Sequence, residues 1–573
     1  MTIERYGISD IGEREHYQRG WRGVKAMIPR SRWISPAIVV LALVLRVAWL
    51  DLKPAHFDEG VNGWFVDAMT RQGYYHYDPT NFHGPLHFYV LFLAQTLLGR
   101  EIWVLRLPLV LVSTACVALV LAYRCYLQER VCQVAALAMA LSPAMVFYGR
   151  YAIHESWLLF FLLLTAWGFA GLWRFGKSRH LWAAALGLTG MILTKETYLI
   201  HVVAFVLAVP CLLFYERRFH STRFPFAGWK FGSGEVVKAA LIGVALIVFF
   251  YSGGLLDWPG PRRFDAHGHP LPLGSLAGLY ECFGAWIRTG TEIDIAPTGH
   301  GKPWHYWLQL IGGIEVTDAK AGERAAISAS ISSELPAAIG LLASCALLAP
   351  RTNRLARYLA IYGLGALIGY SIVSYKTPWC LITLIWPFYF VFGLAVVRCA
   401  QKVDLWSTVA LTTAIFAFSL NATWRLNIHD YANEAEPYVY VQTRQDIDRL
   451  LVPLRTLTAD DPRNRYLTGH ILVPEQHPFL WLLGDYPKID FPGIVPLPDP
   501  LDADVLLVDD PLVDSVEPEL RFNYFKEPLK VRGESIESAT LYLRQSAFGT
   551  VFPGRVPEFQ RGAASAQEEM KPQ

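Results

Sequence analysis

Two adjacent carboxylates, Asp58 and Glu59, are the first side chains in the sequence that could carry out chemistry. They follow the first long apolar run, residues 34–50, and a helix-like segment at 61–69 comes after them. Acids at a helix start are favoured by the helix dipole, so a structural role is one interpretation. The other is catalytic, because a carboxylate at a membrane surface can take a proton from an attacking hydroxyl or amine. The sequence predicts Asp58 as this base, with Glu59 beside it.

A tight turn between the third and fourth apolar runs holds a cation, an imidazole and a carboxylate. These are Arg150, His154 and Glu155. An interfacial arginine–glutamate pair is one interpretation. In the alternative, functional interpretation, Arg150 binds a lipid phosphate and Glu155 helps to position an acceptor or a metal ion. His154 alone is weak evidence for a metal site, so the cofactor stays undefined, with a divalent cation at Asp58 and Glu155 as the candidate.

Two lysines, Lys195 and Lys376, lie at the ends of apolar runs, on the same predicted side as Asp58. Such lysines often extend their ammonium groups toward the membrane interface. The positive-inside bias makes them less expected on an outer face, which favours anion binding. A phosphate leaving group needs cations of this kind, because negative charge accumulates on it as its bond breaks.

Residues 299–307 add aromatic and histidine side chains, among them His300 and Trp304. Aromatic rings beside polar groups suit the faces of sugars, and they equally suit the membrane interface. His300 and Trp304 are therefore candidate substrate-binding residues, with interfacial anchoring as the alternative.

Repeated apolar runs account for the composition of the 573-residue chain, which is 53% hydrophobic and 17% charged. They predict a multi-pass α-helical membrane protein with about eleven spans. The basic residues cluster in short loops and form no single basic face, which argues against nucleic acid as a partner. The eight cysteines lack metal-like pairing. The predicted spans lie near 33–51, 104–123, 131–148, 157–173, 181–194, 198–215, 236–253, 336–350, 358–374, 379–397 and 405–420.

Basic clusters fall in every second loop if the N-terminal segment, residues 1–32, is cytoplasmic. The apolar stretch 85–99 is short for a span, and counting it as one would reverse this pattern. We therefore expect it to be a re-entrant or interfacial helix. This topology places the loops 52–103 and 254–335 on the outer side of a membrane domain at 33–420.

Residues 421–573 differ in composition from the rest of the chain. Charged and proline-rich stretches alternate with β-like runs at 466–468, 470–473, 505–508 and 540–543, and residues 479–483 suit a helical turn. This pattern predicts a soluble α/β domain outside the membrane with a disordered C-terminal tail.

These motifs, in this order, resemble the GT-C superfamily of polyprenyl-phosphate-sugar-dependent glycosyltransferases. Within it, the likeness is to the protein O-mannosyltransferase and lipid A aminoarabinose transferase group, in a prokaryotic branch labelled "flippase-activity-associated". The likeness to the group rests on the acidic pair after the first span, and on four further elements: His83-Gly84-Pro85-Leu86, Arg106-Leu107-Pro108, Arg150-Tyr151 to Glu155 and Leu193-Thr194-Lys195. The likeness to the branch rests on His56 to Gly60, Tyr77-Asp78-Pro79-Thr80, Gly299 to Trp304 and Tyr375 to Trp379.

The resemblance implies an inverting transfer of a sugar from a polyprenyl-phosphate donor to an extracytoplasmic acceptor, which could be a protein, lipid or glycan. It implies that Asp58 is the base, that Arg150 and Lys195 contact the donor phosphate, and that His83 belongs to the substrate site. Glu155 stands where the family usually has aspartate. Glu196 follows Lys195 where the family usually has glycine and proline. We expect the protein in the cell (inner) membrane.

Two rival interpretations remain. A lipid-sugar flippase would need charges deep inside its spans and often shows repeated halves, and the sequence has neither feature. A non-catalytic membrane subunit that presents the outer domain would leave the acidic pair and the outer lysines without a role.

Overall fold

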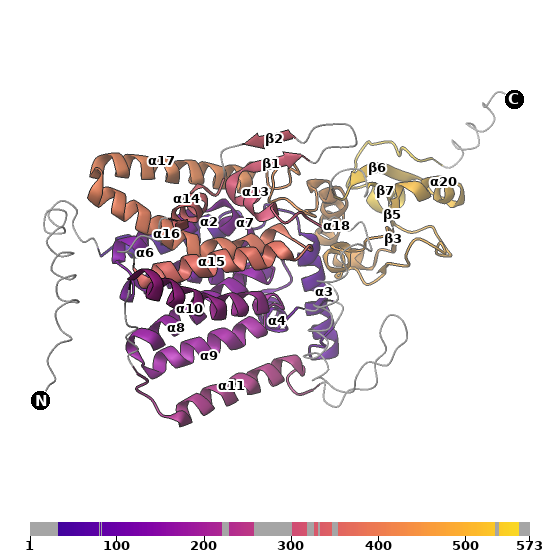
Figure 1. Ribbon diagram of the computed structural model, residues 1–573. Coiled ribbons are helices and arrows are strands. Elements are labelled where there is room, and N and C mark those ends of the chain that lie inside the picture. The colour runs from indigo at the N-terminus through magenta and orange to yellow at the C-terminus, as the bar shows by residue number, and fades with distance from the viewer. Residues whose placement is uncertain are drawn as a thin grey trace, which may run out of the picture.

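The structure is a computed structural model. It describes residues 32–78, 81, 83–220, 228–256, 301–317, 326–329, 333–345, 353–532 and 538–560. The axes of most of the long helices are roughly aligned, and a small domain with a β-sheet lies at one end of them (Figure 1). The helices up to residue 424 are α2 (Ile34–Val47), α3 (Phe57–Gln72), α4 (Leu86–Leu98), α5 (Ile102–Ala122), α6 (Glu129–Leu141), α7 (Pro143–Tyr148), α8 (Glu155–Phe175), α9 (Ser178–Ile192), α10 (Tyr198–His220), α11 (Ser233–Tyr251), α13 (Tyr306–Gly312), α14 (Leu335–Ser344), α15 (Arg354–Ile372), α16 (Leu381–Lys402) and α17 (Leu405–Trp424).

Each of the eleven predicted spans overlaps a helix or a pair of helices, although residues 346–350 of the span 336–350 lie outside the described residues. Among the described residues, seven helical segments are long and apolar enough to cross a membrane by themselves. The third predicted span is divided into α6 and α7 at Ser142. Ser142 is the N-cap of α7, which begins at Pro143, and its hydroxyl accepts a hydrogen bond from the amide of Met145. The seven segments are Ile102–Cys125, Glu155–Phe175, Tyr198–Phe219, Ser233–Tyr251, Arg354–Ile372, Pro378–Lys402 and Leu405–His429.

Helix α4 corresponds to the short apolar stretch 85–99. Its 13 residues extend roughly 20 Å, which is less than the roughly 30 Å of a bilayer's hydrocarbon core. It packs against α3 and α5 on one side and exposes Leu93 and Leu97 on the other. Its place as an interfacial or re-entrant helix remains a prediction from the sequence.

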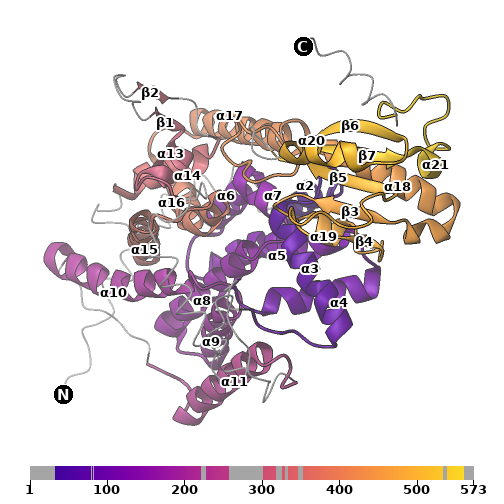
Figure 2. The ribbon, with the colours of Figure 1, turned by 90° about the vertical axis from the view of Figure 1, so that its right-hand side faces the viewer.

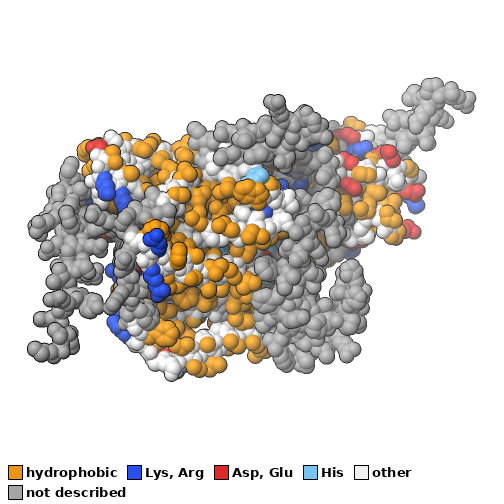
Figure 3. All heavy atoms as spheres, in the orientation of Figure 1, with side chains coloured by type: hydrophobic (Ala, Val, Ile, Leu, Met, Phe, Trp, Pro, Cys, Tyr) orange, Lys and Arg blue, Asp and Glu red, His pale blue; other side chains and the backbone are white. Residues whose placement is uncertain are grey.

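Helix α16 is the centre of the helical part. Of its most apolar 18-residue stretch 89% is buried, whereas the corresponding stretches of α11 and α17 are 11% and 6% buried. α16 packs against α6, α8, α14, α15 and α17. Gly340 allows α14 to pack closely against α16, because a Cβ at this position would lie 2.0 Å from the carbonyl oxygen of Phe388. The peripheral helices present apolar side chains outward (Figure 3), as expected of helices that face lipid.

The C-terminal domain is the predicted small α/β domain. Its five-stranded sheet has the order β4-β3-β5-β7-β6, in which β3 pairs in parallel with β4 and β5, and β7 pairs antiparallel with β5 and β6. Its main elements are α18 (Asp448–Asp460), β3 (Gly469–Leu472), α19 (Phe479–Leu482), β4 (Ile489–Asp490), β5 (Val505–Asp509), α20 (Val513–Val516), β6 (Tyr524–Lys530), β7 (Ser538–Arg544) and α21 (Gln545–Phe548). A separate pair, β1 (Ile314–Thr317) and β2 (Ala326–Ala329), is antiparallel.

The C-terminal domain docks on the helical part through α19, which packs on α3 (Figure 2). Trp481 is 2% exposed and lies in an apolar cluster with Leu105 and Leu109 of α5. Gly63 of α3 makes room for this ring, since a Cβ there would lie 2.5 Å from it. Arg100 donates to the carbonyl of Trp481. A buried tryptophan and a glycine shaped to it fix the domain beside the N-terminus of α3.

Candidate active site

The N-terminus of α3 determines where the two acids point. His56 is the N-cap residue, and its Nδ1 accepts a hydrogen bond of 3.1 Å from the amide of Asp58. The Glu59 carboxylate in turn accepts one of 2.9 Å from the amide of His56, which completes a capping box. Because Nδ1 is an acceptor, Nε2 carries the proton and donates to the carbonyl of Tyr440 at 2.8 Å. Consecutive helical residues point about 100° apart, so the rigid first turn sends the two carboxylates in different directions.

Glu59 points into the protein and is 0% exposed. Its oxygens accept hydrogen bonds from Arg106 at 2.8 and 2.6 Å and from the amide of Ala152 at 2.9 Å, besides that of His56. Although burial alone would raise the pKa of Glu59, the Arg106 guanidinium and these hydrogen bonds hold it below its usual range. Arg106 also binds the carbonyls of Leu50, Lys53 and Pro54. This geometry favours a structural role for Glu59 over the catalytic role expected from the sequence.

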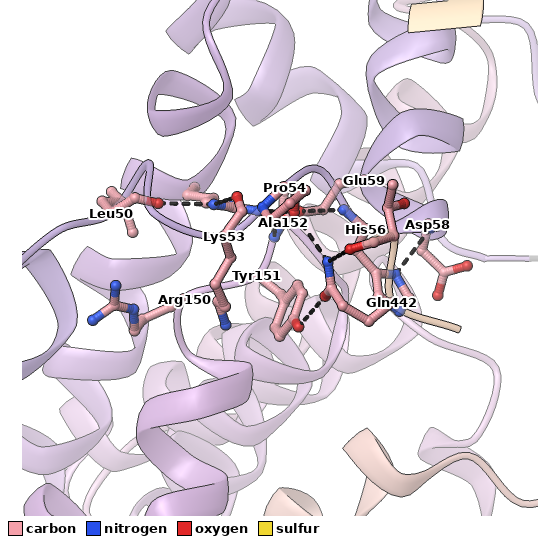
Figure 4. Close-up of polar contacts among 12 residues, drawn as sticks. Leu50, Lys53, Pro54, His56, Asp58, Glu59, Arg150, Tyr151, Ala152 and Gln442 are labelled. Atoms are coloured by element: carbon pink, nitrogen blue, oxygen red, sulfur yellow. Dashed lines mark hydrogen bonds and ion pairs between the residues drawn. The ribbon is translucent and has the colours of Figure 1, made fainter. Parts of the chain in front are cut away.

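Asp58 points the other way, away from this network (Figure 4). Its side chain is partly exposed, and its carboxylate has no hydrogen-bond or ion-pair partner among the described residues. Tyr375, Tyr440 and His477 lie near enough for its charge to act on them. Burial first and Asp58 second raise the pKa of Tyr440 to about 12. The structure thus holds Asp58 with an available carboxylate, beside groups from three separate parts of the chain.

A small pocket lined by aromatic rings lies beside this turn. His56, Tyr151, Trp379 and Tyr440 are among its lining residues. The His56 ring makes edge contacts with Tyr151 and Trp379, at centroid distances of 5.2 and 5.7 Å. Rings of this kind present apolar faces together with polar groups, which suits contact with sugar rings.

Lys195 lies in the turn between α9 and α10 and forms a buried ion pair with Glu155, the first residue of α8. The two side chains are 7% and 2% exposed, and the thiol of Cys380 lies 3.8 Å from the ammonium group. Burial alone would lower the pKa of Lys195, but Cys380 and Glu155 raise it well above its ordinary value. Tyr375 is within electrostatic reach of both Asp58 and Lys195. The predicted base and the predicted cation therefore lie in the same region of the protein, around one tyrosine.

Three histidines lie beside this ion pair: His83 and His154 from the predicted motifs, and His87, which directly follows the first motif. The ring of His154 makes tilted contacts with those of His83 and His87, at centroid distances of 4.6 and 4.2 Å. His83 is hydrogen-bonded to Glu196 at 2.9 Å. Burial, then His87 and His83, lower the pKa of His154 well below its ordinary value, so its ring is neutral. The structure thus brings His83, His154, Glu155 and Lys195 together, as the sequence predicted for one site.

Arg150 and Lys376 contact other groups. Arg150 is 1% exposed and donates to the carbonyls of Leu45 and Trp49 at 3.2 and 2.6 Å, where α2 ends. In Figure 4 it lies at the opposite end of the labelled group from Asp58. Lys376 donates to the carbonyl of Lys302 at 3.2 Å and to that of Val373. Both cations hold backbone together, and neither makes an ion pair with Glu155 as Lys195 does.

The remaining candidates are Trp304 and His300. Trp304 is 67% exposed, and His300 lies outside the described residues. The segment that carries Trp304 pairs with the Tyr375 segment through a bridge between Gly301 and Tyr375. For the proposed cation, no three His, Cys, Asp or Glu side chains in the described part of the chain are grouped to hold a metal. Glu155 is engaged by Lys195, so the donor set around it does not fit a metal ion.

Comparisons with known proteins agree with this architecture. A sequence model of the dolichyl-phosphate-mannose-protein mannosyltransferase family matches residues 82–232. The structure of ArnT from Cupriavidus metallidurans bound to undecaprenyl phosphate has a TM-score of 0.54 at 13% identity, covering 90% of this chain and 98% of ArnT. Its apo form gives 0.54 at 11% identity, covering 88% and 97%. No match was found among curated protein sequences.

The chain therefore shares the fold of ArnT, and its long apolar helices are those of a multi-pass membrane protein. The family match over residues 82–232 and the fold shared with ArnT agree with the resemblance to the GT-C superfamily of glycosyltransferases. The matched segment contains His83, Arg150, Glu155 and Lys195, whereas Asp58 precedes it.

Several residues of the site were not assigned a role from the sequence. The ring of Tyr440 and the ammonium group of Lys302 lie 5.8 Å apart, and Tyr440 also accepts the hydrogen bond from His56. His477 comes from the C-terminal domain, for which the sequence offered no recognisable motif. Lys302 and Tyr375 do stand inside motifs, so their signal was present without a role attached to it.

Proposed function

We propose that the protein is a glycosyltransferase that moves a sugar from a polyprenyl-phosphate donor to an extracytoplasmic acceptor. One observation carries this proposal: an available carboxylate, Asp58, and a buried cation, Lys195, both lie within electrostatic reach of Tyr375. The bound undecaprenyl phosphate in the structure of ArnT, which has the same fold, supports a donor of this class.

In this mechanism the Asp58 carboxylate accepts the proton of an acceptor hydroxyl or amine as that group attacks the anomeric carbon of the donor sugar. The bond from the acceptor to the sugar forms while the bond from the sugar to the phosphate oxygen breaks. The electron pair stays on that oxygen, and polyprenyl phosphate leaves. Attack on the face opposite the phosphate inverts the anomeric centre.

Lys195 is the cation placed for the leaving phosphate. An ammonium group in a water-poor site stabilises developing negative charge better than one in bulk water. Glu155 is paired with this ammonium group, so the donor phosphate would share or displace the carboxylate. We assign Arg150 and Lys376 to support of the backbone, which revises the phosphate contacts implied by the resemblance.

We further propose that the N-terminal segment is cytoplasmic and that the C-terminal domain lies outside the cell (inner) membrane. Lys and Arg side chains of the helical part gather at the end opposite the C-terminal domain (Figure 3). The positive-inside rule supports a cytoplasmic location for that end. Asp58 and Lys195 then face the side on which lipid-linked sugars meet extracytoplasmic acceptors.

The test is sugar transfer by purified protein in lipid vesicles, supplied with labelled polyprenyl-phosphate sugars and an envelope extract as acceptor. Asp58→Asn removes the base, and we expect a loss of about 10²- to 10⁴-fold. Asp51→Asn is the matched control, because Asp51 is an exposed acid seven positions earlier, and it should transfer normally. Full activity of Asp58→Asn would disprove the assignment of the base. Faster movement of labelled lipid across the bilayer without any transfer would favour the flippase instead.

A further inference from the structure

The C-terminal domain reaches the predicted base through the loop that leads into α19. His477 of this loop lies against Phe57 and Trp64 of α3, with ring centroids 5.6 and 6.4 Å apart. The guanidinium of Arg532, from the same domain, lies 4.7 Å above the Phe57 ring. Phe57, Asp58, Trp64 and His477 are all partly exposed. Residues of two domains therefore form one surface beside the Asp58 carboxylate.

His477, at the edge of this surface, has one ring nitrogen without a hydrogen-bond partner among the described residues. This nitrogen, Nδ1, is buried. Burial, then the positive charge of Arg532, lower the pKa of His477 to about 4, although Asp58 opposes this shift. At neutral pH the ring is therefore uncharged and can either donate or accept a hydrogen bond. A buried ring nitrogen without a partner is costly, and a ligand hydroxyl would remove that cost.

We propose that His477 is a substrate-binding residue, which hydrogen-bonds a hydroxyl of a sugar ring held between Phe57, Trp64 and Asp58. This inference rests on the proposed function and adds the C-terminal domain to the substrate site. Aromatic rings beside a neutral hydrogen-bonding group and a carboxylate are the chemistry that a hydroxylated ring requires. The ring belongs either to the donor or to the acceptor, and both would present the same groups.

The position of His477 is fixed by close packing of the neighbouring loop on α3. A Cβ added to Gly60 would lie 2.5 Å from both Cα and Cβ of Pro478, the residue next to His477. Gly60→Ala would therefore displace the loop without changing a group that touches substrate. It provides a second way to move His477, independent of replacing its side chain.

The experiment compares the wild-type protein with His477→Ala, His477→Asn, Gly60→Ala and His470→Ala in vesicles. The transfer rate is measured against the concentration of the labelled donor and, separately, against the amount of acceptor extract. We expect His477→Ala and Gly60→Ala to raise the apparent KM for one of the two by about five- to tenfold, the equivalent of one neutral hydrogen bond. The substrate whose apparent KM rises identifies the sugar bound by His477 as that of the donor or that of the acceptor.

Two variants separate binding from folding. The side-chain amide of Asn can replace a ring nitrogen as a donor or acceptor, so His477→Asn should return KM to within about twofold of wild type. His470 belongs to the same domain but pairs with Asp490, and His470→Ala should leave both KM values unchanged. Unchanged KM values in His477→Ala, or equal losses in His477→Ala and His477→Asn, would overturn the inference alone. An inactive wild-type protein would overturn the proposed function and this inference together.

Discussion

Replacing Glu59 with glutamine separates the structural acid from the proposed catalytic one. Glu59 and Arg106 are both 0% exposed and are joined by two hydrogen bonds. The side-chain amide of the glutamine would retain one acceptor oxygen and turn an NH₂ group toward donors, so about half of the four hydrogen bonds to the carboxylate would be lost. The guanidinium would stay buried without its counter-charge. Breaking a buried pair in this way costs about 3–5 kcal/mol.

The assay is unfolding of the purified protein in mixed micelles by increasing amounts of denaturing detergent, followed by tryptophan fluorescence. We expect Glu59→Gln to lower the free energy of unfolding by about 3–5 kcal/mol. Asp58→Asn should change it by less than about 0.5 kcal/mol, because the Asp58 carboxylate has no partner in the described structure. Transfer per folded molecule should show the opposite order, with the larger loss in Asp58→Asn.

One pattern of results would refute this reasoning. If Glu59→Gln were as stable as wild type and inactive, while Asp58→Asn remained active, then Glu59 would be the base. The buried geometry of Glu59 would then have been misleading. If both variants were unstable, the first turn of α3 would depend on both carboxylates, and the division of roles between them would be wrong.

Three further predictions follow from the same contacts. The lowered pKa of Glu59 contributes stability above about pH 4.3 that is lost as the pH falls through its folded-state pKa, so acid unfolding below about pH 4 should be less steep in Glu59→Gln than in wild type. Lys195→Gln should reduce transfer about 10²- to 10³-fold at saturating donor. Arg150→Gln should unfold at a lower concentration of denaturing detergent but transfer normally per folded molecule. The reverse result would restore Arg150 as the phosphate ligand. Trp481→Ala empties a buried contact and should cost about 3–5 kcal/mol, with faster proteolysis between the domains, while an unchanged cleavage rate would mean that Trp481 does not hold the domain.

The helices and the grouping of Lys195 with Glu155 could be predicted because their signals are local. Apolar runs of membrane length mark the spans, and charged residues at their ends mark the site. The role of Glu59 could not be predicted, because its partner Arg106 lies on another helix 47 positions away. From the sequence, two neighbouring acids look equivalent, and only the direction of each side chain separates them.

Elements of the C-terminal domain were missed for local reasons. Strand β6 contains Pro528 and three charged residues, which is tolerated because β6 is the edge strand of the sheet. Helix α18 contains Pro453, which weakens its helical pattern. The contact between His477 and Phe57 joins two domains, and no spacing in the sequence could indicate it.

The hydrogen bond between His56 and Tyr440 also bears on how the protein is made, because 384 residues separate the two. At roughly 5–20 residues per second, the ribosome needs roughly 20–80 s to reach the second residue after the first. During that time the acid-bearing turn is already in the membrane while its support is not yet synthesised. A chain that ends early, or loses its C-terminal domain to a protease, would keep Asp58 and Lys195 but lack the carbonyl that anchors His56. Translation through the last domain thus determines when the active site becomes complete.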